Sequence, residues 1–248
     1  MANWNDDQST RQGFGVSPNL SGDVATRTTF DAGLRSHMLS IYNYMTSGVL
    51  LTGIVALLFA RSGMAAQVMT GGPLTWLIIL SPLAIVLGMN FGANRFSKGT
   101  LAAMFWGFAV LMGLSMSTIF LVYTGASIAV TFFATAGAFA GLSLFGYTTQ
   151  KNLTGMGSFL IMGVVGLLLA MLLNMWLQSP GLMYAISGIG VLIFAGLTAY
   201  DTQRLKNQYA EVRGTEWAGK AVVLGALTLY LDFINMFQFL LSFLGGRE

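Results

Sequence analysis

Residues 50–60 read LLTGIVALLFA, an apolar run without a charged side chain. A strand of a membrane barrel alternates apolar and polar residues, whereas a continuous apolar run is typical of a transmembrane helix. A helix needs about 20 predominantly apolar residues to cross the bilayer core. Outward from this run, the same criterion selects seven stretches: residues 41–60, 73–93, 101–123, 126–147, 156–177, 182–200 and 221–243. The sequence therefore predicts an all-α integral membrane protein with seven transmembrane helices.

The composition excludes several other classes of protein. Only 8% of the 248 residues are charged and 55% are hydrophobic, whereas a soluble domain carries about 25% charged residues. A net charge of +3 does not support a nucleic-acid-binding surface. Without cysteine the chain has no disulfide, iron–sulfur cluster or thiolate zinc site, and one histidine cannot build a histidine metal cluster. We therefore expect no cofactor.

The basic residues predict how the helices are oriented. Ten fall in segments on one side of the membrane: Arg11, Arg27, Arg35, Arg95, Lys98, Lys151, Arg204, Lys206, Arg213 and Lys220. Only Arg61 and Arg247 fall on the other side. Because basic loops stay in the cytoplasm, the N-terminus is expected inside and the C-terminus outside.

The sequence also suggests two domains. Residues 1–30 form a polar tail without the pattern of a signal peptide, and residues 31–248 form the transmembrane domain. The segment 28–44 either lies on the membrane surface or extends the first helix. In the fourth helix, Gly137 and Gly141 are expected to allow close packing of helix backbones.

Two carboxylates lie inside the last two predicted helices or at their edges. Asp201 stands in GLTAYDTQRLK and Asp232 in LTLYLDFINMF. One ionised aspartate at the bilayer centre costs roughly 2.5–3.5 kcal/mol, so such a residue points to function. The two helices are antiparallel neighbours, and the aspartates lie symmetrically about the polar stretch 211–219. Both side chains are therefore expected at the same depth, if the sixth helix extends beyond its apolar stretch.

Local spacing surrounds the aspartates with polar groups. Thr198 precedes Asp201 by three residues, and Thr228 and Asn235 lie on the same helix face as Asp232. Two adjacent carboxylates in a low dielectric cannot both ionise cheaply, so they share a proton and titrate as a pair. Alternatively, Asp201 lies at the membrane boundary and pairs with Arg204, while Asp232 bonds the backbone or a threonine.

Four segments resemble the Bax inhibitor family, in particular its bacterial members. They are DAGLRSHMLSIYNYM (31–45), FGYTTQKNLTGMGSFL (145–160), FAGLTAYDTQRLK (194–206) and LYLDFINMFQFLL (229–241). The resemblance implies a fold in which helix seven is central and wrapped by the other six. It implies a pH-sensitive calcium leak with Asp201 and Asp232 as the proton sensor and a basic partner from helix two, for which Arg95 is the candidate.

Three functions compete on this sequence. The first is a pH-regulated calcium leak channel or exchanger-like pathway, in which both aspartates bind calcium weakly. The second is a non-conducting regulator of a membrane-anchored AAA protease, a partner linked to bacterial relatives, with residues 1–30 as the contact. The third is an intramembrane aspartyl protease, which Tyr200–Asp201 matches but residues 229–232 do not, because the Gly-x-Gly-Asp pattern is missing. We expect a bacterial inner-membrane protein that is not an enzyme.

Overall fold

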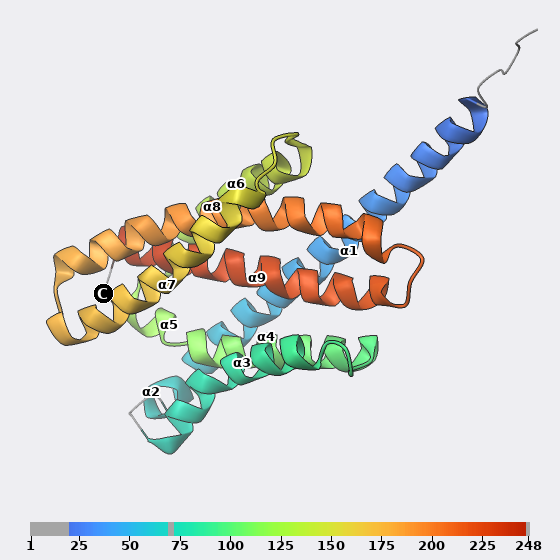
Figure 1. Cartoon of the computed structure of the whole chain (residues 1–248). Coiled ribbons are helices and arrows are strands. Elements are labelled where there is room, and N and C mark those ends of the chain that lie inside the picture. Colours follow the sequence, from blue (N-terminus) through green and yellow to red (C-terminus); the bar gives the residue numbers. More distant parts are fainter. Residues whose placement is uncertain (1–19, 69–71, 247–248) are drawn as a thin grey trace, which may run out of the picture.

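The computed structural model describes residues 20–68 and 72–246, which form nine helices (Figure 1). α4 and α5 together form one candidate membrane span, and α2 is too short to be one. The described helices therefore give seven spans that are long and apolar enough to cross a membrane, and the expected number is confirmed. The helices are α1 (Leu20–Arg61), α2 (Met64–Val68), α3 (Pro73–Gly92), α4 (Lys98–Met116), α5 (Ile119–Val122), α6 (Gly125–Thr148), α7 (Thr154–Leu177), α8 (Pro180–Val212) and α9 (Trp217–Leu244).

Local sequence signals fix where several helices begin. The side chains of Ser97, Thr124 and Ser179 precede α4, α6 and α8, and each accepts a hydrogen bond from the backbone N–H three residues later. These bonds satisfy donors that the first helical turn leaves without a partner. Pro180 then occupies the first position of α8, where its missing N–H is harmless.

Two helices are longer than their apolar stretches. α1 runs without a break from Leu20, so the segment 28–44 extends the first helix rather than forming a separate surface helix. The expected tail, residues 1–30, lies mostly outside the described residues, and α1 begins within it. α8 continues past residue 200 to Val212, because protein packing replaces lipid contact there and Leu205 and Val212 are buried.

Helix α9 is far more enclosed than the other spans. Of the residues in its most apolar 18-residue stretch, 72% are buried, against 17–39% in the other six spans. It packs against α1, α4, α6 and α8, and Figure 1 shows it beside α8. Aromatic rings fill these contacts: Tyr230 meets Phe105 and Phe108, and Phe233 meets Phe132 and Phe139. Aromatic contacts therefore join α9 to α4 and α6.

The glycines that bring helices together are not the pair expected in the fourth span. Gly137 and Gly141 face open space, so the expectation that they allow close packing is wrong. The close approach is at Gly146 instead, where an added Cβ would overlap the carbonyl oxygen of Ala199 on α8. This contact holds α6 directly against the part of α8 that carries Asp201.

The two ends of the bundle differ in which turns they carry. Figure 1 shows the α3–α4, α6–α7 and α8–α9 turns at the same end as the start of α1, with the C-terminus at the opposite end. An odd number of spans requires this separation of the chain's ends.

Candidate functional site

The two sequence-predicted aspartates meet between α8 and α9. Asp201 and Asp232 are only 7% and 4% exposed, and their carboxyl groups lie close enough to interact. Because α8 continues to Val212, Asp201 lies well inside a helix that packs along α9. The folded chain thus brings together two acidic groups that are 31 positions apart in the sequence, from 201 to 232.

The two carboxyl groups of the pair can form a hydrogen bond with each other only if one of them is protonated. Oδ2 of Asp232 is the one buried side-chain nitrogen or oxygen in the described part of the chain without a hydrogen-bond partner. Ionised carboxylates only accept hydrogen bonds, so two of them cannot bond each other unless one carries a proton. The geometry therefore fits a pair that holds at least one proton between its four oxygens.

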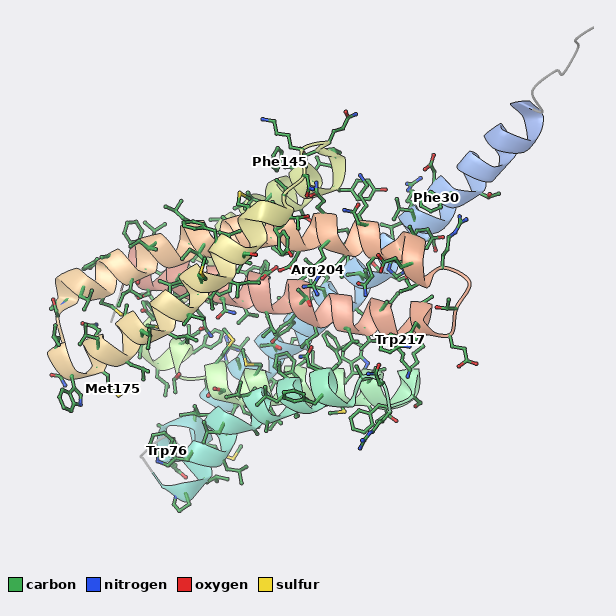
Figure 2. The ribbon with its side chains drawn as sticks, viewed as in Figure 1. Phe30, Trp76, Phe145, Met175, Arg204 and Trp217 are labelled. Carbon is green, nitrogen blue, oxygen red and sulfur yellow. The ribbon has the colours of Figure 1, made fainter. Side chains whose placement is uncertain are left out.

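Arg204, which Figure 2 labels, is a charged neighbour of Asp201. Its Nη1 lies 3.7 Å from Oδ1 of Asp201, one turn along α8, and its side chain is 65% exposed. The sequence offered this ion pair and the aspartate pair as alternatives. In the structure Asp201 makes both contacts, while Asp232 has no ion pair among the described residues.

The three polar residues expected around the pair direct their donors elsewhere. Thr198, Thr228 and Asn235 each donate to a backbone carbonyl four residues earlier in their own helix, at 2.8, 3.2 and 2.8 Å respectively. Each keeps an oxygen with free lone pairs. These residues can therefore accept hydrogen bonds or supply ligand oxygens. The hydroxyl donors of Thr198 and Thr228 are occupied, and one of the two amide N–H donors of Asn235 is used.

Arg95 lies in a turn and not on the helices that carry the aspartates. It is exposed in the turn that joins α3 to α4, where its backbone N–H bonds the carbonyl of Gly92 at 2.9 Å. No ion pair between Arg95 and either aspartate occurs within the described residues. Its role as the closing partner, which rests on family resemblance, stays a prediction.

A buried hydroxyl chain beside the pair was not anticipated from the sequence. Tyr42 Oη of α1 lies 2.5 Å from Ser143 Oγ of α6, which lies 2.9 Å from Thr202 Oγ1 of α8. Thr202 is fully buried and directly follows Asp201. Only that adjacency was visible in the sequence, since the partners come from distant helices. These hydrogen-bonded hydroxyl groups connect α1, α6 and α8 next to Asp201.

The acidic groups are few for a metal centre. Within residues 20–68 and 72–246, no three His, Cys, Asp or Glu side chains gather closely enough to hold a metal ion. Calcium takes six to eight oxygen ligands. Asp201 and Asp232 with neighbouring hydroxyls and water would give a weak cation site.

Comparisons with known proteins cover nearly the whole chain. The family model described as "Inhibitor of apoptosis-promoting Bax1" matches residues 34–248. An uncharacterised protein of Caulobacter vibrioides is 48% identical over 247 residues, which covers 94% of this chain and 97% of the relative. "Inner membrane protein YbhL" of Escherichia coli K12 is 45% identical over 220 residues, covering 88% and 94%. An uncharacterised membrane protein of Streptococcus pyogenes is 30% identical over 228 residues, covering 91% and 99%.

Proposed function

The chain belongs to the Bax inhibitor family, and from this membership and the aspartate pair we propose that it is a calcium leak pathway controlled by protons. The observation that carries the proposal is the juxtaposition of Asp201 and Asp232, two buried carboxyls on different spans. A buried acidic pair in a membrane is costly, and functional sites are where such cost is tolerated.

The protonated pair is the closed state. A proton held between Asp201 and Asp232 gives a hydrogen bond in place of repulsion and ties α8 to α9 within the bundle. The cation beside Asp201 and the burial of Asp232 support a negative charge on Asp201 and a proton on Asp232. In this state the pair carries one negative charge, partly balanced by Arg204.

Loss of the proton opens the pathway. Two neighbouring ionised carboxylates repel each other and, at the same time, attract a divalent cation. Carboxylate oxygens with water and the free lone pairs of Thr198, Thr228 and Asn235 would bind calcium weakly. Weak binding suits conduction, because an ion must leave the site as easily as it enters.

We place the protein in the bacterial inner membrane with its N-terminus in the cytoplasm. The Escherichia coli relative, named an inner membrane protein, supports the location. The excess of Lys and Arg at the end that carries the α3–α4, α6–α7 and α8–α9 turns supports the orientation. No enzymatic activity and no resident cofactor are part of the proposal; calcium and protons are the transported or sensed ions.

Flux into proteoliposomes tests the proposal. The purified full chain is reconstituted with a calcium-sensitive dye inside the vesicles, and influx is followed at fixed external calcium from pH 5.5 to 8.5. We expect protein-dependent calcium influx that increases with pH. Vesicles with the double variant Asp201→Asn/Asp232→Asn are the control and should show low flux at every pH. Absence of flux in the unmodified protein at all pH values would contradict the proposal and favour the regulatory function toward a membrane-anchored AAA protease.

A further inference from the structure

A long apolar groove separates α1 from α6. One cavity of about 680 Å³ lies between these helices, and Phe233 of α9 forms its floor. A second cavity of about 310 Å³ continues it, because Val49, Phe132 and Phe233 line both. Leu39, Leu50 and Leu144 at the rim of the first cavity are 49%, 55% and 64% exposed. The groove therefore opens sideways, toward the lipid.

The groove is long enough to hold an acyl chain from its headgroup to the middle of the bilayer. On α1 its lining extends from Arg35 to Ala56. At about 1.5 Å per residue those 21 steps span roughly 31 Å, close to the thickness of the hydrocarbon core of a bilayer at about 30 Å. The groove thus offers apolar contact along the full depth that acyl chains occupy.

Basic side chains gather at one end of the groove only. Arg35 of α1 and Tyr147 of α6 line that end. Lys206 of α8 reaches it, since its Nζ lies 2.7 Å from the carbonyl oxygen of Tyr147 and 5.2 Å from the centre of the Tyr147 ring. Asp31, one turn before Arg35, makes no ion pair with it in the described part of the chain. Two positive charges therefore flank the mouth of an otherwise apolar groove.

The hydrogen bond between Tyr42 of α1 and Ser143 of α6 limits the size of a molecule that can enter the groove. Tyr42 Oη and Ser143 Oγ, one from each wall, are only 2.5 Å apart. A helix with its side chains is about 10–12 Å across. A transmembrane helix of a second copy or of a partner protein cannot enter between side chains that already touch, whereas an acyl chain can lie over them.

We propose that this groove binds one phospholipid with an anionic headgroup. The acyl chain lies along Val49, Ala136 and Phe139, and the phosphate lies between Arg35 and Lys206. Basic pockets between helices at the cytoplasmic face are the form that recognition of anionic headgroups takes in membrane proteins. The inference does not depend on calcium conduction.

Lipid binding by the purified full chain measures this directly. Native mass spectrometry follows titration with phosphatidylglycerol or phosphatidylcholine of identical dioleoyl chains. We expect phosphatidylglycerol to bind more tightly, and Arg35→Gln/Lys206→Gln to weaken it about tenfold or more, to the level of phosphatidylcholine. The matched control Arg95→Gln/Lys98→Gln removes two charges from the α3–α4 region and should leave binding unchanged. Equal binding of both lipids, or equal effects of the two double variants, would overturn the proposal.

Position in the groove is tested first on the unmodified protein, so that the mapping itself does not depend on the folding of a variant. Phosphatidylglycerol with a diazirine in one acyl chain is irradiated in nanodiscs, and the labelled peptides are mapped. Labels should concentrate on the stretches of α1 and α6 that line the groove, and Ala136→Phe should reduce them. Labels spread evenly over the lipid-facing helices, or found only on α7, would show that no lipid is held here.

Discussion

The guanidinium of Arg204 lies 3.7 Å from Oδ1 of Asp201, whereas Asp232, the buried carboxyl next to Asp201, makes no ion pair in the described structure. The two aspartates therefore differ in their electrostatic surroundings, because only Asp201 has an arginine beside it among the described residues. Arg204, one turn away from Asp201 on the same helix, is the basic residue that contacts the pair among the described ion pairs.

Arg204→Gln should move the pH dependence of calcium flux to higher pH. The positive charge stabilises ionised Asp201, so without it the pair keeps its protons to a higher pH. Because Arg204 is 65% exposed, solvent screens the effect, and we expect a shift below about one pH unit. The measurement is the pH at half-maximal flux in proteoliposomes. Arg95→Gln is the comparison: a shift with Arg95→Gln and none with Arg204→Gln would assign the partner to helix two, as family resemblance implies.

Ser143→Ala should destabilise the bundle. The change removes the hydroxyl that joins Tyr42 of α1 to Thr202 of α8. Bonds of this kind between membrane helices contribute about 0.6 kcal/mol each, up to about 1.7, so a loss of roughly 1–2 kcal/mol is expected. Ser40→Ala is the control, because Ser40 bonds only the carbonyl of Ser36 in its own helix. Unfolding of both variants in mixed micelles is compared; equal stabilities would show that the hydroxyl chain contributes nothing.

Gly146→Ala and Gly137→Ala should have opposite effects. A methyl group at 146 would overlap the backbone of Ala199 and push α6 away from α8, at a cost of about 1–3 kcal/mol. At 137 it meets open space, and alanine is the better helix former by about 0.5–1 kcal/mol. Thermal unfolding in detergent gives the order of stabilities. A destabilised Gly137→Ala variant together with an unaffected Gly146→Ala variant would contradict this packing.

Reporter fusions test the orientation. The excess of basic residues predicts that fusions after Lys98 and Lys151 both read cytoplasmic, and that a fusion at the C-terminus reads periplasmic. Paired alkaline phosphatase and green fluorescent protein fusions distinguish the two sides. A periplasmic signal after Lys98 or Lys151 would reverse the orientation or change the number of spans.

The features predictable from the sequence are those that depend on local composition or on neighbouring helices. Continuous apolar runs revealed the seven spans because hydropathy responds directly to lipid contact. Asp201 and Asp232 could be paired because their helices are consecutive and antiparallel, so their depth follows from their distance to the shared turn. Hydropathy did not give the end of α8, because residues 201–212 (DTQRLKNQYAEV) are mostly polar although the helix continues through them.

The missed features depend on how each helix is rotated about its axis. Gly137 and Gly141 form a packing motif in the sequence, yet they face open space. Tyr42, Ser143 and Thr202 carry no shared signal in one sequence, because three separate helices bring them together. Rotation is set by all the contacts of a helix at once, and helices with apolar residues on every side carry little periodicity to reveal it.

The single variants Asp201→Asn and Asp232→Asn, measured with the double variant, test the shared proton most directly. Calcium influx into proteoliposomes is recorded against pH for all four proteins. In the unmodified protein we expect flux to rise steeply between about pH 6 and 8 as the pair loses its proton. Each single variant removes the repulsion between two charges and should give low flux that barely depends on pH. The double variant should add little, because both changes act on one proton. Single variants that keep the parent's pH profile, or effects that simply add in the double variant, would contradict the shared-proton switch.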